Sequence, residues 1–173
     1  MVKYALINGI LLDGTEAMEP QTGLTILTNG DRIETIVPAE EVHSGYETVD
    51  LAGRYVMPGL INLHVHLPAS GKPTMKQKDA KKTVRTMTSN ALLRSILFKL
   101  CAGYAKTELM SGVTTLRTVG GVQAVDSQLR DKILSGKAVG PRILAGNMAV
   151  SVPGGHMAGS LAYEATSPEE AAA

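Results

Sequence analysis

Short apolar and β-branched runs, separated by turn dipeptides, fill residues 1–56 of the chain. Residues 32–37 alternate polar and apolar side chains as a half-buried strand does, and Asn29-Gly30 just before them is a strong hairpin signal. Residues 1–56 are therefore predicted to form a small antiparallel β unit. Its expected strands are residues 4–13 with a bend at Asn8-Gly9, 24–28, 32–37, 47–51 and 54–56.

From residue 57 onward, longer apolar runs alternate with segments of helical periodicity. Residues 60–66 are mostly apolar, which is typical of a strand that is buried on both faces. Between residues 83 and 110, apolar side chains recur at helical spacing, which predicts one long helix. The other expected elements are strands at 113–119 and 141–145, a helix at 122–134, a Gly-rich loop at 146–160 and a helix that starts at 167–170.

The alternation of strands and helices indicates a parallel sheet with right-handed crossovers. A closed eight-stranded α/β barrel takes roughly 250 residues. Residues 57–173 can supply only its first three strand units. We therefore expect an incomplete barrel whose last strand has an unpaired edge. Such an edge predicts a homo-oligomer, other self-association, or completion by another chain.

Composition and charge exclude several classes of partner. The 17 Lys and Arg residues nearly balance the 16 Asp and Glu residues, and a formal net charge of +1 argues against nucleic acid as a partner. Aromatic residues make up 3% of the chain, which disfavours stacking platforms for bases. We expect no membrane span, because no apolar run is long enough, and no signal peptide. Together with the single cysteine, these features predict a cytoplasmic protein.

The candidate chemistry begins with His64-Val65-His66, at the end of the strand expected over residues 60–66. Residues two apart in a strand share a face, so both imidazoles are expected to project the same way, just before a loop. The carboxyl ends of strands are where α/β barrels place their active sites, and imidazole is a good ligand for Zn²⁺. The alternative is two unrelated histidines that lie close together by chance.

The surroundings of these histidines resemble the amidohydrolase superfamily. Residues 58–66 read Pro-Gly-Leu-Ile-Asn-Leu-His-Val-His, similar to the metal-binding signature of that superfamily, in which apolar residues separate Asp, His and His. Residues 112–117 and 140–144 resemble its second and third barrel strands, and Gly154-Gly155-His156 resembles the loop that follows. Residues 1–56 resemble the small β-sandwich that precedes its barrel. Within the superfamily, the chain is most similar to the branch of imidazolonepropionase-like enzymes and metal-dependent prolidases.

This resemblance implies a fold class, which is α/β: a small N-terminal β-sandwich-type unit followed by the first three β/α units of a TIM-type barrel. It also implies hydrolysis of a C–N bond in a small amide, dipeptide-like or cyclic amide substrate, through a metal-activated water. His64 and His66 would be ligands of a divalent metal, with zinc expected. The remaining ligands and a proton-transferring Asp would come from later strands, so we expect residues 1–173 to be an N-terminal portion that is inactive alone.

Two further side chains are candidate substrate-binding groups by the same resemblance. His156 would contact a substrate carbonyl or carboxylate at the barrel mouth, and the alternative is a histidine of a surface loop. Arg117 would bind a substrate carboxylate or form a structural ion pair. The sequence departs from the family pattern at Asn62 and Thr118, where Asp is common, so neither position contributes a carboxylate to the barrel mouth.

Other functions are weighed against this one. A non-catalytic binding or scaffold protein with a degenerate amidohydrolase framework would hold no metal tightly. A serine hydrolase built on Ser151 and His156 is disfavoured, since no Gly-x-Ser-x-Gly elbow occurs. Phosphate-binding glycine motifs are also missing from the sequence. The remaining candidate residues are expected to have structural or solvent-exposed roles without chemistry. These are a packed thiol for Cys101, a solvated side chain for His43 and a solvated loop for the lysines Lys72, Lys76, Lys78, Lys81 and Lys82.

Overall fold

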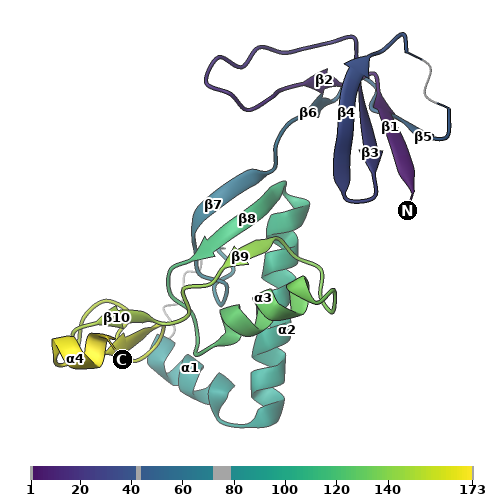
Figure 1. Ribbon diagram of the computed structural model, residues 1–173. Helices are drawn as coiled ribbons and strands as arrows, with labels where there is room; N and C mark the ends of the chain where they lie inside the picture. Colours follow the sequence, from purple (N-terminus) through teal and green to yellow (C-terminus); the bar gives the residue numbers. More distant parts are fainter. Residues whose placement is uncertain (1, 42–43, 72–78, 173) are drawn as a thin grey trace. The chain divides into compact units, whose positions relative to one another are not determined.

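The computed structural model describes residues 2–41, 44–71 and 79–172 (Figure 1). The chain divides into two compact units, an N-terminal unit of Met1–Pro58 and a C-terminal unit of Gly59–Ala173. That these units are a sandwich portion and a barrel portion stays a prediction. The residues discussed above that lie outside the described ranges are His43, Lys72, Lys76 and Lys78.

The N-terminal unit consists of short strands. They are β1 (Lys3–Ile7), β2 (Ile10–Leu11), β3 (Leu24–Asn29), β4 (Arg32–Pro38), β5 (Glu47–Asp50) and β6 (Tyr55–Val56). One sheet has the strand order β4–β3–β1–β5, and β2 pairs with β6. The pairs β1–β3 and β3–β4 are antiparallel, as hairpin signals predict, but β1–β5 and β2–β6 are parallel. The expectation of a purely antiparallel unit is therefore wrong, because β5 returns to the far edge of β1 instead of pairing with β4.

Asn8 divides the strand that was expected over residues 4–13. Its φ of 56° lies in the left-handed region, which Asn tolerates better than most residues. β1 ends just before this turn and β2 begins just after it, and the two strands join different sheets. The predicted bend is confirmed, and its effect is to end one strand and start another.

The C-terminal unit mixes helices with a parallel sheet. Its elements are β7 (Leu60–Val65), α1 (Ala80–Thr88), α2 (Ala91–Met110), β8 (Val113–Thr118), α3 (Val125–Leu134), β9 (Arg142–Leu144), β10 (Ala149–Ser151), β11 (Ala162–Glu164) and α4 (Pro168–Ala172). The sheet order is β7–β8–β9, and both pairings are parallel. Figure 1 shows the helices α2 and α3 against this sheet. The predicted α/β class is confirmed as a mixed α/β fold.

The single helix expected over residues 83–110 is wrong, because two helices meet at Ser89-Asn90. The Asn90 backbone is extended, with φ −148° and ψ 169°, and its side chain accepts a hydrogen bond from the Leu93 N–H at 3.0 Å. Asn is among the best N-cap residues, since its side-chain oxygen satisfies a free amide of the first turn. Apolar periodicity continued across this boundary, so the cap was the only local signal of it.

Replacing Asn90 with alanine removes this cap and is expected to lower the free energy of unfolding by roughly 0.5–2 kcal/mol. Asn90→Ser keeps a capping oxygen and serves as the control, with an expected loss of only a few tenths of a kcal/mol. Urea unfolding followed by far-UV circular dichroism measures both. Equal stability of the alanine variant and the wild type would show that α2 does not depend on its cap.

The core of the C-terminal unit lies between the sheet and the helices α2 and α3. Leu116 on β8 and Ile143 on β9 pack with Leu129 of α3 and with Cys101 and Leu97 of α2. Cys101 is fully buried, and burial raises the pKa of its thiol to about 12. The interpretation of Cys101 as a packed thiol is confirmed.

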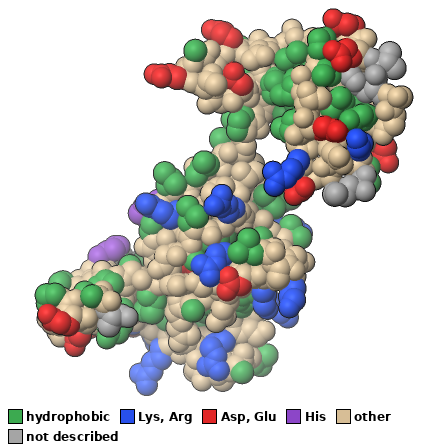
Figure 2. Space-filling model, in the orientation of Figure 1, with side chains coloured by type: hydrophobic (Ala, Val, Ile, Leu, Met, Phe, Trp, Pro, Cys, Tyr) green, Lys and Arg blue, Asp and Glu red, His purple; other side chains and the backbone are tan. Residues whose placement is uncertain are grey.

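β7 is less buried than its apolar sequence predicts. Ile61 and Leu63 are 64% and 56% exposed, because β7 is an edge strand and its face away from the helices is open to solvent in the described part of the chain. Burial on both faces is therefore wrong for this chain. Among the described residues, no helix has both the length and the apolar character needed to cross a bilayer. On the face shown in Figure 2, the described Lys and Arg side chains are spread out instead of forming one basic patch.

Candidate functional site

β7 contains an irregularity directly before its histidines. Asn62 pairs with Leu116 and Val65 pairs with Thr118, so three steps along β7 match two along β8. Such an extra residue is a β-bulge, which redirects side chains at the end of a strand. Asn62 Nδ2 donates to Glu108 Oε2 of α2 at 3.4 Å, and Val65 packs against the core, so both face the helices.

His64 is the penultimate residue of β7, directly before Val65, and His66 is the first residue after the strand. Their ring centroids are 5.2 Å apart, and the ring planes meet at 75°. A pocket of about 270 Å³ lies beside the two rings at the edge of the sheet. Its other lining residues come from β7, from the turn after it and from α2: Asn62, Val65, Ala69, Ser70, Gly71, Tyr104, Thr107 and Glu108. The structure thus brings together the two histidines that the sequence singles out.

The hydrogen bond of His66 fixes its protonation pattern. Its Nδ1 lies 3.0 Å from the Gly120 carbonyl oxygen, and a carbonyl can only accept. Nδ1 therefore donates, and the neutral imidazole keeps its lone pair on Nε2. A histidine held by one ring nitrogen in this way presents the other nitrogen to a metal ion.

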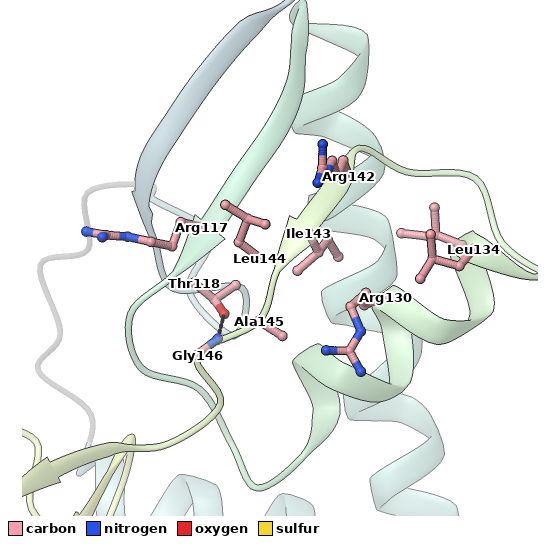
Figure 3. A pocket seen from close by; sticks show the side chains of 10 residues that line it. Arg117, Thr118, Arg130, Leu134, Arg142, Ile143, Leu144, Ala145 and Gly146 are labelled. Atoms are coloured by element: carbon pink, nitrogen blue, oxygen red, sulfur yellow. Dashed lines mark hydrogen bonds between the residues drawn. The ribbon is translucent and has the colours of Figure 1, made fainter. Parts of the chain in front are cut away.

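Arg117 contacts the bulge. Its Nε donates to the Leu63 carbonyl at 2.9 Å, which joins β8 to the irregular part of β7. The sequence predicts that Arg117 binds a substrate carboxylate or forms a structural ion pair. The observed bond does neither, because it holds the main chain of β7 in place. Arg117 forms no ion pair with another described residue. Figure 3 shows its side chain reaching from β8 away from Arg130 and Leu134, which come from α3. A role in substrate binding stays a prediction.

Arg117 also lines a second pocket, of about 580 Å³, at the β9 side of the sheet (Figure 3). At the edge of this pocket the Gly146 N–H donates to Thr118 Oγ1 at 2.8 Å. Thr118, which stands where the family pattern often has Asp, thus ties the end of β8 to the chain after β9. Its side chain is fully buried and holds two main-chain segments together.

His156 lies in an exposed turn between β10 and β11. It forms no hydrogen bond or ion pair with other described residues, and it is not among the residues that line the pocket beside His64 and His66. The described residues also show no hydrogen bond between Ser151 and His156, so the serine hydrolase pair is not assembled. A contact between His156 and substrate stays a prediction.

Sequence reasoning missed Asp126, in the first turn of α3. Its side chain is fully buried, and its carboxylate accepts no well-formed hydrogen bond from the described residues, although the Thr118 hydroxyl is close enough to interact with it. Burial raises the pKa of the Asp126 carboxyl, and the nearby Thr118 hydroxyl and His66 imidazole oppose that rise. An acid in the first turn of a helix is expected from the helix dipole alone, so the sequence carries no signal that this one is buried.

The donor set suits a divalent metal of the zinc type, since zinc binds neutral imidazole nitrogen and the Nε2 lone pair of His66 is available. Among the described residues, no group of three or more His, Cys, Asp or Glu side chains is arranged to hold a metal ion. His64 and His66 are therefore a two-ligand pair, whereas a catalytic zinc site usually has three protein ligands.

Comparison with known protein families shows which family this chain belongs to. The sequence profile of the Amidohydrolase family matches residues 55–172, more than half of the chain. The chain belongs to the amidohydrolase family. Amidohydrolases generally bind divalent metals, in agreement with the donor set at the end of β7. The match extends from β6 to α4 and thus includes both histidines, β8, β9 and the turn that carries His156.

Solved structures of amidohydrolase type resemble the chain closely. A putative prolidase from Bifidobacterium longum is 33% identical, with a TM-score of 0.74 over 98% of this chain and 36% of that one. A Xaa-Pro dipeptidase with bound methionine in its active site is 28% identical, with a TM-score of 0.71 over 98% of this chain and 40% of that one. The predicted resemblance to prolidase-type amidohydrolases is confirmed.

Curated relatives match shorter segments. A dihydroorotase from Staphylococcus aureus (strain N315) is 33% identical over 84 residues, which are 49% of this chain and 18% of the relative. An N-acetylglucosamine-6-phosphate deacetylase from Haemophilus influenzae is 31% identical over 65 residues, which are 38% of this chain and 16% of the relative. The matched segment thus spans less than a fifth of each of these curated relatives.

Proposed function

We propose that this amidohydrolase chain belongs to a metal-dependent hydrolase that cleaves a C–N bond in a small amide, dipeptide-like or cyclic amide substrate, with zinc as the metal. The observation that carries the proposal is the His64–His66 pair, with ring centroids 5.2 Å apart and Nδ1 of His66 bonded to the Gly120 carbonyl. The similar proteins act on small amide or dipeptide substrates, which supports the substrate class.

In this proposal His64 and His66 would hold the metal, which when bound would make a water acidic enough to react near neutral pH. The Gly120 carbonyl and Arg117 would keep the two imidazoles in position. The Gly120 carbonyl keeps the proton of His66 on Nδ1, and Arg117 holds the Leu63 carbonyl so that the bulge keeps both rings on one side of β7. His156 and Arg117 remain the candidates for contact with substrate oxygens.

Zinc binding by the chain tests the proposal. We expect His64→Gln and His66→Gln each to weaken Zn²⁺ binding by about 10-fold or more, because each removes one of the two imidazole ligands. The double variant should bind no more zinc than buffer. Competition with a chromophoric chelator measures the affinity, and elemental analysis after dialysis measures the stoichiometry.

Lys137→Gln, at an exposed position after α3, is the matched control and should bind zinc as the wild type does. Equal zinc binding by the double variant and the wild type would overturn the assignment of the site. A wild-type chain that holds no zinc would favour the alternative, a binding or scaffold protein with a degenerate amidohydrolase framework. Because residues 1–173 are expected to be inactive alone, a protein that also carries the later strands, assayed on Xaa-Pro dipeptides and on dihydroorotate with and without added zinc, separates the substrate classes.

A further inference from the structure

Two successive glycines after β8 lie between His66 and Asp126. Gly120 accepts the hydrogen bond from His66, and a Cβ atom built on Gly120 would lie 3.2 Å from both Cε1 and Nδ1 of the imidazole. A Cβ atom built on Gly121 would lie 2.6 Å from Oδ2 and 2.9 Å from Oδ1 of Asp126. The imidazole and the carboxylate therefore pack directly against neighbouring residues of one short main-chain segment, which leaves a tight fit for a side chain at position 120 and no room for one at position 121.

The burial of Asp126 is unusual within this unit. The other buried polar side chains there are satisfied, since Thr118 accepts from the Gly146 N–H and Ser160 donates to the Met157 carbonyl. Asp126 is 0% exposed, and among the described residues its carboxylate has no well-formed hydrogen bond, only an interaction with the Thr118 hydroxyl. A buried carboxylate that is so poorly satisfied destabilises a fold, so its presence calls for a role other than packing.

We propose that Asp126 is a positioning residue for His66: its carboxylate holds the Gly120–Gly121 segment beneath the imidazole and balances the charge of a cation bound to His66. This inference rests on the proposed function, because the cation is the metal assigned to His64 and His66. The link between the two side chains is geometric, because Gly120 lies against the imidazole and its neighbour Gly121 lies against the carboxylate. Few groups screen a charge in a buried interior, so a carboxylate held there can act on a cation beyond contact distance.

Asp126→Asn tests the proposal, because the amide keeps the shape of the carboxylate and removes its charge. We expect the affinity for Zn²⁺ to fall roughly 10- to 100-fold, as for other groups that support a metal ligand without touching the metal. Asp131→Asn makes the same change on an exposed, surface-paired residue of α3 and should leave the affinity within about 2-fold of wild type. A purely structural Asp126 would lower the unfolding stability on replacement, whereas we expect stability to be kept or raised when the unpaired charge is removed.

A metal-free measurement separates this inference from the proposed function. The ¹⁵N shifts of His66 in the apo chain report which ring nitrogen holds the proton, and we expect Nδ1 in the wild type and a mixture of tautomers in Asp126→Asn. Gly121→Ala displaces the carboxylate by sterics and should change the tautomers in the same direction, which keeps the test valid if the asparagine variant does not fold.

Zinc binding that is equal in Asp126→Asn and wild type would overturn the inference and leave the proposed function intact. Failure of the wild type to bind zinc would overturn the proposed function, and the ¹⁵N shifts would then decide the role of Asp126. Unchanged tautomers in both variants would show that it does not position His66.

Discussion

Leu116→Ala is expected to lower the free energy of unfolding of the C-terminal unit by roughly 2–5 kcal/mol. Leu116 lies on the central strand β8 and is 0% exposed, where it packs with the core residues of α2, α3 and β9. Alanine at this position removes buried apolar surface and leaves a cavity among side chains that both layers hold in place. Urea unfolding followed by circular dichroism gives the difference in free energy.

Leu134→Ala is the matched control, because it makes the same chemical change at the end of α3 on a side chain that is 75% exposed. Its effect should stay within about 0.5 kcal/mol of wild type. A similar loss for the two variants would mean that the sheet and helices of this unit do not share the core described above.

Gly146→Ala is expected to destabilise the C-terminal unit by roughly 1–3 kcal/mol, through crowding. A Cβ atom at this position would clash with the main-chain oxygen of Thr118, so one of the two main-chain segments must move. The same movement would weaken the hydrogen bond from the Gly146 N–H to Thr118 Oγ1. Thermal unfolding measures the loss as a lower melting temperature.

Gly103→Ala makes the same substitution with the opposite expected sign. Gly103 lies on an exposed position of α2, and a Cβ atom there would meet no atom within 4 Å. Alanine in an open helical site should raise the stability by roughly 0.4–1 kcal/mol, since glycine loses more backbone entropy on folding. Two variants that both lose stability would mean that sterics at Gly146 are not the cause.

Local patterns predicted the elements of the fold well where one feature dominated. The alternation in residues 32–37 and the turn at Asn29-Gly30 gave a hairpin, β3–β4, as expected. Local patterns failed where the pairing of a strand depended on residues far away in the sequence. β5 pairs parallel to β1 because of where the intervening chain returns, and no residue in either strand encodes that choice. The break at Asn90 was hidden because apolar spacing continued across it.

The candidate site was predictable in part for the same reason. Alternation along a strand predicts that His64 and His66 project the same way, and their rings do lie close together, so the sequence sufficed to pair them. The bulge before them, the hydrogen bond from Arg117 and the buried carboxylate of Asp126 all require contacts between segments far apart in the chain. Position 118 is an example. The sequence shows that Thr118 stands where the family often has Asp. Only the structure shows that Asp126, eight residues later, brings a carboxylate near the Thr118 hydroxyl.

The two hydrogen bonds that orient the histidines each join residues 54 positions apart, His66 to Gly120 and Arg117 to Leu63. A chain that has been synthesised only as far as α2 lacks Arg117 and Gly120. Neither hydrogen bond can then orient the two imidazoles. If zinc binds as proposed, the capacity to bind it should arise when β8 docks, after the motif itself has been synthesised. Zinc binding at the proposed site would then report the closure of a long-range loop.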